Sequence, residues 1–135
     1  MAHWLLKTEP STYGFDDLAR DGRTAWDGIT NPVALKNLRS ASVGDLAVVY
    51  HTGDEKRAVG VCAIVRAAYP NPKTKSEKPD VVDVEARERL AAPVELATLK
   101  ADPAFADSPL VKQGRLSFVP LTDAQWKRLM ALSRR

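Results

Sequence analysis

Hydrogen-bonding side chains follow an apolar run near the N-terminus of this sequence. Residues Trp4–Leu6 predict a buried strand, and directly after it come Lys7, Thr8 and Glu9. Pro10 then ends the strand, because its ring fixes its own φ and restrains the preceding residue. A rigid strand that ends in polar groups is typical of a binding site. An edge strand that simply meets solvent would show the same pattern, so both interpretations stay open here.

A second polar pair ends a second apolar run. Asp45–Thr52 predicts a buried strand that closes with His51 and Thr52. Ala58–Tyr69 predicts the other strand of a hairpin. Gly60 inside that strand indicates a bulge or a close approach of another group to the backbone. A single histidine at a strand end is usually structural, so a ligand role for His51 depends on other polar groups that converge there.

Trp26 lies just before a predicted helix. Asn31 and Pro32 form a strong helix start, with a side chain that caps the first turn and a proline where no amide proton is needed. The beginning of a helix offers free amide donors and positive potential, which can hold a carbonyl or an anion. Trp26 is therefore a candidate ligand contact. The commoner outcome for such a tryptophan is burial in the core, and this alternative stays open.

The remaining elements follow from hydrophobic spacing and turn residues. The pattern predicts a short helix over Phe15–Arg20, an alternating strand from Val81, a helix over Pro93–Lys100, a last strand over Leu110–Val119, and a final helix capped by Thr122 and Gln125. Pro70–Pro79 predicts a mobile loop, rich in proline and lysine. Its lysines could contact phosphates, although a solvated loop is the more common meaning of such a run.

Composition restricts the class of protein. The chain has 135 residues, 44% of them hydrophobic and 27% charged, which predicts one globular domain over residues 1–135. The net charge of +3 permits a polyanionic partner without requiring one. No apolar run is long enough to span a bilayer and no export signal is visible, so we expect a cytoplasmic location, or a nuclear one in a eukaryote. Cys62, the only cysteine, lies in an apolar run and predicts a packing role.

The sequence carries no motif for catalysis or cofactor binding. It lacks a glycine-rich phosphate loop, a nucleophile elbow and a metal-binding histidine pair. The acids near the polar clusters, Glu9 and Asp27, have no evident catalytic partner, so we expect no catalytic residue, no metal and no cofactor. What remains is a set of hydrogen-bonding groups at two strand ends and one aromatic ring. That set suits recognition of a flat polar heterocycle.

Several stretches together resemble one known family. They are Trp4–Pro10, Trp26–Ile29 with Asn31, Tyr50–Thr52, Ala67–Pro70, and Leu110–Val119 with Thr122 and Trp126. In this order and at these spacings the chain resembles an EVE domain of the PUA-like superfamily. The resemblance implies an α+β fold, in which a mixed β pseudo-barrel with packed helices is related to YTH and ASCH domains. It also implies a pocket that accepts a flipped-out, modified nucleobase.

The resemblance assigns roles position by position. It implies base binding by Lys7, Thr8, Glu9, Trp26, Gly28, Asn31, His51 and Thr52. Phosphate contacts are expected from Lys73, Lys75, Lys112 and Arg115. Members of the family often carry arginine where this chain has Thr30, and asparagine where it has Gly53. The loss of a planar arginine donor affects the choice of ligand more than the fold.

The resulting hypothesis is a monomeric, non-catalytic module that reads a modified base in DNA or RNA and does not bind membranes. Two other classes of protein stay open. A protein-interaction domain would lack a concave pocket beside Trp26. An enzyme that acts on a nucleobase would use Glu9 or His51 as acid or base, with a strongly perturbed pKa in a closed pocket.

Overall fold

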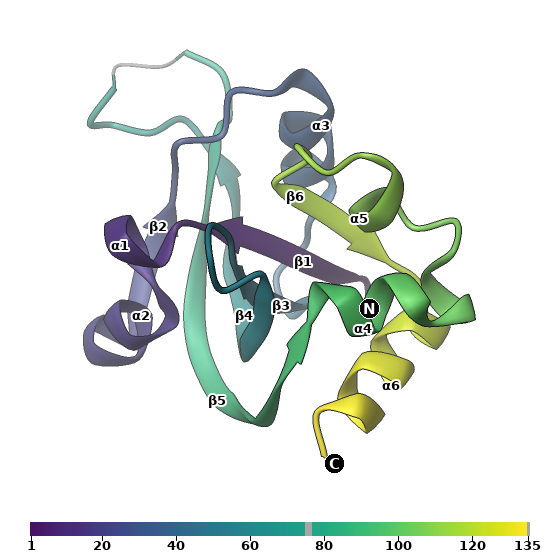
Figure 1. Cartoon of the computed structure of the whole chain (residues 1–135). Helices are drawn as coiled ribbons and strands as arrows, with labels where there is room; N and C mark the ends of the chain where they lie inside the picture. Colours follow the sequence, from purple (N-terminus) through teal and green to yellow (C-terminus); the bar gives the residue numbers. More distant parts are fainter. Residues whose placement is uncertain (75–76, 135) are drawn as a thin grey trace.

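A curved mixed sheet forms the centre of the molecule, as the computed structural model in Figure 1 shows for residues 1–74 and 77–134. In the described residues the sheet has six strands in the order β2-β5-β4-β3-β1-β6. The strands are β1 (His3–Thr8), β2 (Arg23–Trp26), β3 (Leu46–His51), β4 (Arg57–Tyr69), β5 (Val81–Glu95) and β6 (Phe118–Leu121). β1 runs parallel to β3, and the other neighbouring pairs are antiparallel. This architecture confirms the predicted α+β, PUA-like fold.

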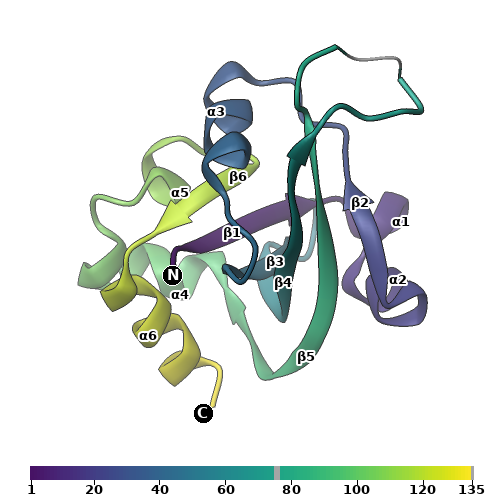
Figure 2. The same ribbon diagram turned by 180° about the vertical axis from the view of Figure 1, so that it is seen from behind.

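Interruptions in the ladder curve the sheet. The register between β4 and β5 shifts at several points, and a further shift lies between Val49 and Tyr50 of β3. Such bulges bend a strand and increase its twist. β5 accordingly follows a wide arc around β3 and β4, which brings β2 at one end of the sheet toward the first strand's end (Figures 1 and 2).

Short helices cover the ends of this sheet. They are α1 (Pro10–Tyr13), α2 (Phe15–Asp21), α3 (Pro32–Ser40), α4 (Leu96–Ala101), the 3-10 turn η1 (Pro103–Phe105), α5 (Pro109–Lys112) and α6 (Asp123–Leu132). α1 and α2 lie beside β2, whereas α4, α5 and α6 lie together near the chain termini (Figure 1). No helix in the described part of the chain is long and apolar enough to cross a membrane.

Several local predictions are confirmed. β3 and β4 form the predicted antiparallel hairpin. The Asn31 side chain caps α3 by accepting from the amides of Val33 and Ala34. Thr122 and Gln125 form the predicted capping box of α6. Each of these signals is short-range, so the local sequence contains all of the required groups.

Two predicted elements agree with the structure only in part. The segment that begins at Pro93 continues β5 as far as Glu95, and the helix starts only at Leu96. Ala58 pairs with Val94 while Gly60 pairs with Arg89, so Pro93 lies in a bulge where the ladder needs no amide donor.

The predicted last strand is also different. Its first part is the helical turn α5, because Ser108 accepts a hydrogen bond from the Leu110 amide and Pro109 occupies the first helical position. Only β6 at the end of that segment is extended. The stretch Arg23–Trp26, for which no strand was predicted, forms β2 at the edge of the sheet.

The core lies between the curved sheet and the helices. Leu5, Leu6 and Cys62 are fully buried in it, and burial raises the pKa of the Cys62 thiol to about 12. This environment confirms the predicted packing role of Cys62, because a thiol with so high a pKa is not a nucleophile at neutral pH. Gly60 is the close approach that the sequence indicated: a Cβ at this position would lie 2.3 Å from Cε1 of Phe15.

Candidate functional site

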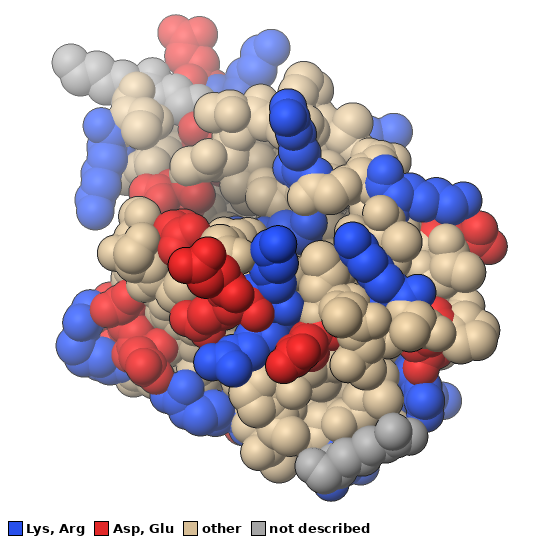
Figure 3. Space-filling view, viewed as in Figure 1, with Lys and Arg blue, Asp and Glu red and all other residues tan. Residues whose placement is uncertain are grey.

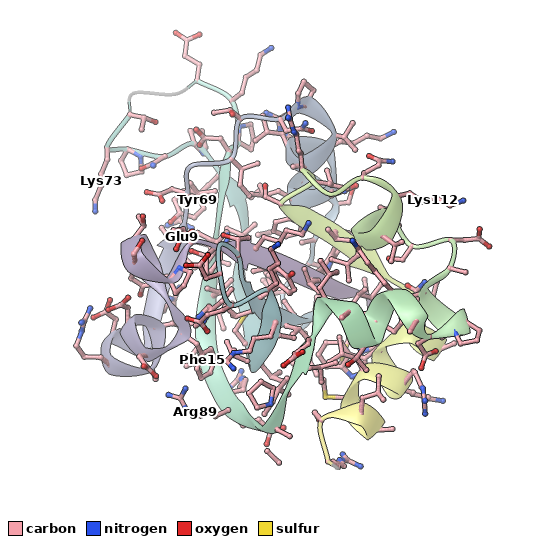
Figure 4. All side chains as sticks on the ribbon, viewed as in Figure 1. Glu9, Phe15, Tyr69, Lys73, Arg89 and Lys112 are labelled. Carbon is pink, nitrogen blue, oxygen red and sulfur yellow. The ribbon has the colours of Figure 1, made fainter. Side chains whose placement is uncertain are left out.

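A cavity of about 450 Å³ opens beside Trp26. We call it the Trp26 cavity, and its walls come from α1, β2, the end of β4 and the loop that follows β4. Its lining residues are Thr12, Tyr13, Thr24, Ala25, Trp26, Asp27, Tyr69, Asn71, Pro72 and Lys73. In Figure 4, Tyr69 and Lys73 lie on the same side of the molecule as α1. The volume lies within the range of about 300–1,000 Å³ that is typical of small-ligand pockets.

Three aromatic rings border the Trp26 cavity. Tyr13 meets Trp26 edge-on, with ring centroids 6.3 Å apart and an interplanar angle of 84°. The Trp26 residue is only 6% exposed and belongs to the hydrophobic core. Trp26 therefore serves both as a core residue and as a wall of the cavity. Tyr13 and Tyr69 are less deeply buried and complete the aromatic lining.

A polar network holds Tyr69 in place. Its hydroxyl donates to the Asp83 carboxylate, which also binds Arg23 at 3.1 Å. The Arg66 guanidinium lies 3.6 Å from the centroid of the Tyr69 ring. Burial raises the pKa of Tyr69, and the hydrogen bond to Asp83 raises it further. The hydroxyl therefore stays protonated, and the ring is fixed from its edge and from one face.

Two polar groups of the Trp26 cavity have free hydrogen-bonding capacity. Asn71 is buried, and its Oδ1 accepts from the Lys73 amide at 3.0 Å, which leaves its Nδ2 without a partner in residues 1–74 and 77–134. The Asp27 carboxylate is exposed and has no hydrogen bond or ion pair within the same ranges. These two residues give the cavity an amide donor and a carboxylate acceptor, beside the Thr12 hydroxyl and the Lys73 ammonium that also line it.

The segment Pro70–Pro79 was predicted as a solvated loop, but the structure buries Asn71 near its start. Asn71 is 4% exposed, and its backbone amide donates to Asp80 at 2.9 Å across the base of the loop. This closure brings Pro72 and Lys73 to the Trp26 cavity. Lys75 lies outside the described residues.

A second cavity, of about 190 Å³, lies where the β3–β4 turn meets α4 and α5. We call it the Lys7 cavity. It is lined by Lys7, Tyr50, Thr52, Gly53, Lys56, Leu96, Lys100, Leu110, Val111 and Gly114. The structure therefore divides the predicted base-binding residues: Trp26 borders one cavity, whereas Lys7 and Thr52 border the other. Lys7 and Thr8 separate in this way because successive side chains of a strand point to opposite faces.

Glu9 and Thr8 connect the two regions. The Thr8 hydroxyl donates to the Tyr13 carbonyl at 2.6 Å, and the Glu9 carboxylate caps α1 by accepting from the Ser11 amide. Glu9 also lies against Gly53: a Cβ on Gly53 would be 2.8 Å from its Oε2. Gly53 has a φ of +73°, a conformation that glycine tolerates. Where members of the family often carry asparagine, this glycine has no side chain and therefore leaves room for Glu9.

His51 is held inside the protein by both ring nitrogens. Its Nε2 accepts from the Phe15 amide at 3.0 Å, so Nδ1 carries the proton and donates to Glu55 at 3.0 Å. The residue is 8% exposed and borders neither cavity. In this arrangement His51 attaches α2 to the end of β3, and its contact with a base stays a prediction.

The other predicted site residues lie further from the two cavities. Gly28 occupies the loop before α3 with a φ of +80°, and Asn31 uses its side chain to cap that helix. Lys112 forms an ion pair with Asp107 at 3.1 Å, and Arg115 is exposed in the turn after α5. Figure 4 places Lys112 on the opposite side of this view from Lys73. Among the described residues, the predicted phosphate contacts Lys73 and Lys112 thus do not lie in one compact patch.

Sequence reasoning missed Tyr13, Tyr69 and Asn71 as lining residues. Tyr69 lay within the Ala67–Pro70 stretch that carried the family resemblance, so its signal was visible. Tyr13 and Asn71 follow turn residues at Pro10 and Pro70, where sequence does not reveal the direction of the side chain. Only the curvature of β5 brings these segments to Trp26.

The curved mixed sheet, the helices at its ends and the cavity beside an aromatic residue define an α+β protein of the PUA-like class. The ASCH protein of Zymomonas mobilis shares this fold, with a TM-score of 0.60 over 96% of this chain and 94% of that one, at 12% identity. The chain belongs to the EVE domain family, whose model matches residues 2–132.

Two relatives define the similarity more closely. Rpa0253 from Rhodopseudomonas palustris is 38% identical, with a TM-score of 0.92 over 99% of this chain and 94% of its own. Human thymocyte nuclear protein 1 is 27% identical over 97% of this chain and 73% of the human protein. A crystal structure of the human protein in complex with 5-methylcytosine-containing DNA superposes with a TM-score of 0.91 over 100% of this chain and 99% of that one.

Proposed function

We propose that this EVE domain is a non-catalytic DNA-binding module that takes a modified base, flipped out of the helix, into the Trp26 cavity. The observation that carries the proposal is a cavity with three aromatic walls and two unpaired polar groups. 5-Methylcytosine is the first candidate, because a human relative was crystallised with DNA that contains it.

The energetics of base flipping fit this cavity. Extrusion of a base costs a few kcal/mol, and a stack on an aromatic ring returns about 1–3 kcal/mol. Trp26 is too deeply buried to offer a full face without rearrangement, so Tyr13 and Tyr69 share the contact with it. A 5-methyl group gains most from such a wall, because each buried CH₂-sized group contributes about 0.8 kcal/mol.

The polar groups supply selectivity for cytosine. The exocyclic amine of cytosine is a donor, and Asp27 is an acceptor at the edge of the cavity. The ring nitrogen and carbonyl of cytosine are acceptors, and the Asn71 Nδ2 is a free donor. Thymine presents a carbonyl in place of the amine and would face the Asp27 carboxylate unfavourably. The cavity therefore favours 5-methylcytosine over thymine, although both carry the methyl group.

The other predicted residues concern contacts to the DNA on either side of the flipped base. Lys73 borders the Trp26 cavity and is placed to meet a flanking phosphate. The roles proposed for Thr8, Glu9, Gly28, Asn31, His51 and Thr52 as base contacts, and for Lys112 and Arg115 as phosphate contacts, require rearrangement or a wider DNA footprint. A phosphate contact by Lys75, which lies outside the described residues, stays a proposal. RNA is the second candidate ligand. The module is proposed to act as a monomer. Its proposed location is the cytoplasm, or the nucleus in a eukaryote.

The alternatives have less support. A protein-interaction domain was expected to lack a cavity beside Trp26, and a cavity of about 450 Å³ lies there. An enzyme was expected to hold Glu9 or His51 in a closed pocket. Glu9 is exposed and caps α1, and both nitrogens of His51 bind protein groups.

The proposal is tested by titrating the intrinsic tryptophan fluorescence with matched duplexes that carry one cytosine, 5-methylcytosine or thymine, and with the corresponding RNA. We expect saturable binding that is strongest for 5-methylcytosine DNA. Asp27→Ala removes only an exposed, unpaired carboxylate, so the fold should persist while the preference for 5-methylcytosine over thymine falls about tenfold.

Glu88→Ala is the matched control, because it removes an exposed carboxylate that borders neither cavity. Trp26→Ala should abolish base-dependent binding, with the fold checked by circular dichroism because Trp26 is also a core residue. Equal affinity for all duplexes, unchanged in Asp27→Ala, would contradict the proposal. The protein-interaction domain would then be the favoured hypothesis.

A further inference from the structure

The Lys7 cavity has the features of an anion-binding site that is separate from the Trp26 cavity. Lysines from three elements surround it: Lys7 from β1, Lys56 from the β3–β4 turn and Lys100 from α4. None of the residues that line it is acidic. Figure 3 shows Lys and Arg side chains near the middle of the face that it draws, with Asp and Glu side chains beside them.

Lys7 lies half-buried and has no carboxylate partner among the residues that the structure describes. Its Nζ donates to the Gly114 carbonyl at 2.8 Å and lies 5.8 Å from the centroid of the Tyr50 ring. A lysine ammonium has three donors, so this geometry leaves donors free for a ligand. Burial lowers the pKa of Lys7, because burial disfavours the charged ammonium. A bound anion would favour that charged form.

Tyr50 places a second donor at the Lys7 cavity. Its residue is 3% exposed and borders the Lys7 cavity. Within residues 1–74 and 77–134 its hydroxyl has no hydrogen-bond partner. The hydroxyl oxygen itself keeps contact with solvent, so in the Lys7 cavity it is free to donate a hydrogen bond to a ligand oxygen.

The neighbouring charges limit where an anion can bind. Asp54, Glu55 and Glu95 line an adjacent hollow that shares Lys56 and Lys100 with the Lys7 cavity. On the other side, the Glu9 carboxylate lies against Gly53. An anion is therefore directed inward, toward Lys7 and Tyr50, and away from these carboxylates.

We propose that the Lys7 cavity binds a phosphate group through Lys7, Lys56, Lys100 and the Tyr50 hydroxyl. Three separate point charges suit an anion with several oxygens better than a single carboxylate, and lysine is a common phosphate ligand. The apolar side chains of Leu96 and Val111 would contact the carbon part of a phosphate ester. The phosphate belongs either to the backbone of bound DNA or to a free phosphorylated small molecule.

The first experiment measures amide chemical shifts of Gly53, Lys56 and Gly114 during titration with inorganic phosphate and with dimethyl phosphate, at constant ionic strength. We expect saturable shifts in the wild type. Lys7→Met and Tyr50→Phe should each weaken binding about tenfold. Lys127→Met is the control, because Lys127 is exposed on α6 and borders neither the Lys7 cavity nor the Trp26 cavity.

The second experiment identifies the source of the phosphate. If it comes from DNA, Lys7→Met lowers the affinity for a duplex and reduces the salt slope by about 0.9, and inorganic phosphate competes with the duplex. If it comes from a small molecule, Lys7→Met loses phosphate binding while duplex affinity is unchanged. The absence of saturable shifts with either probe, or equal shifts in Lys7→Met and Lys127→Met, would overturn the proposal. The titration with free phosphate needs no base recognition, so it can fail or succeed independently of the Trp26 cavity.

Discussion

At the scale of single residues, Asp45 connects the start of β1 to the segment that precedes β3. One carboxylate oxygen accepts from the Ala2 amide at 3.0 Å, and the other accepts from Trp4 Nε1 at 3.0 Å and the Ser42 amide at 2.8 Å. Asp45 is 4% exposed. Burial raises the pKa of this carboxyl, but the hydrogen bonds from Ser42, Trp4 and Ala2 outweigh burial and hold the pKa below its ordinary value.

This arrangement predicts a pH-dependent stability. We expect Asp45→Asn to lower the free energy of unfolding at pH 7 by at least about 1.5 kcal/mol, because an amide cannot accept all of these hydrogen bonds. The ionised carboxylate stabilises the fold fully above its unfolded pKa of about 3.9, and this contribution is lost as the pH falls through the lower folded pKa. Urea unfolding at pH 7 and pH 3 measures the difference between variant and wild type. A difference of equal size at both pH values would contradict this role.

At the scale of elements, α2 is attached to the sheet by contacts around Phe15. The Phe15 ring packs over Gly60, its amide donates to His51, and the Arg89 guanidinium lies 5.2 Å from its ring centroid. Figure 4 shows Phe15 and Arg89 close together below α1. Because α1 and α2 are separated by Gly14 alone, the position of Tyr13 in the Trp26 cavity depends on this attachment.

A side chain at position 60 should therefore disturb the Trp26 cavity from a distance. Gly60→Val would place a Cβ 2.3 Å from the Phe15 ring, and we expect a loss of about 1–3 kcal/mol in the free energy of unfolding. Hydrogen exchange should also increase over Phe15–Asp21. Gly114→Ala is the control, since a Cβ there meets nothing within 4 Å. If α2 exchanges equally slowly in both variants, the attachment does not depend on this contact.

The elements also show what the sequence could and could not predict. The hairpin and the caps at Asn31 and Thr122 depend on neighbouring residues, and both were predicted correctly. Pro93 was misassigned because a proline that begins a helix and a proline in a bulge share the same local sequence. The missed helix α5 had a visible helix-start signal in Ser108 and Pro109. The spacing of the apolar residues that follow favoured a strand, and the prediction followed that spacing.

The candidate site was harder to predict from the sequence than the helices and strands. The polar ends of β1 and β3 do meet, as the predicted convergence required: the Thr52 amide donates to the Thr8 carbonyl at 2.9 Å. Their side chains, however, divide between two cavities, and the aromatic walls come from segments near residues 13, 26 and 69. These contacts depend on the register shifts between β4 and β5, which no local pattern encodes.

At the scale of the whole molecule, the net charge of +3 is spread rather than concentrated. Basic and acidic side chains alternate on the face in Figure 3. Many basic side chains already form ion pairs with carboxylates of the same protein, as Lys112 does with Asp107. DNA binding should therefore show a shallow salt dependence, because few phosphates are neutralised.

This charge distribution gives a further prediction. Four phosphate contacts would give a slope of log K against log salt of roughly −3.6. We expect Lys73→Ala to reduce the slope by about 0.9 and Lys112→Ala by less, because Lys112 is already paired. Fluorescence titrations at several salt concentrations measure the slope, with Lys127→Ala as the control. An unchanged slope in Lys73→Ala would place that lysine outside the DNA footprint.

The position of β1 has a consequence for biosynthesis. Among the strands of this domain β1 is made first, yet one of its edges pairs with β3 and the other with β6, the last strand in the described residues. The sheet of this domain therefore cannot be completed until β6 has left the ribosome. A product truncated before Phe118 would leave an open strand edge flanked by Leu5 and Leu6, and such edges pair readily with other chains. Termination before β6 should thus yield aggregates and not a smaller folded domain.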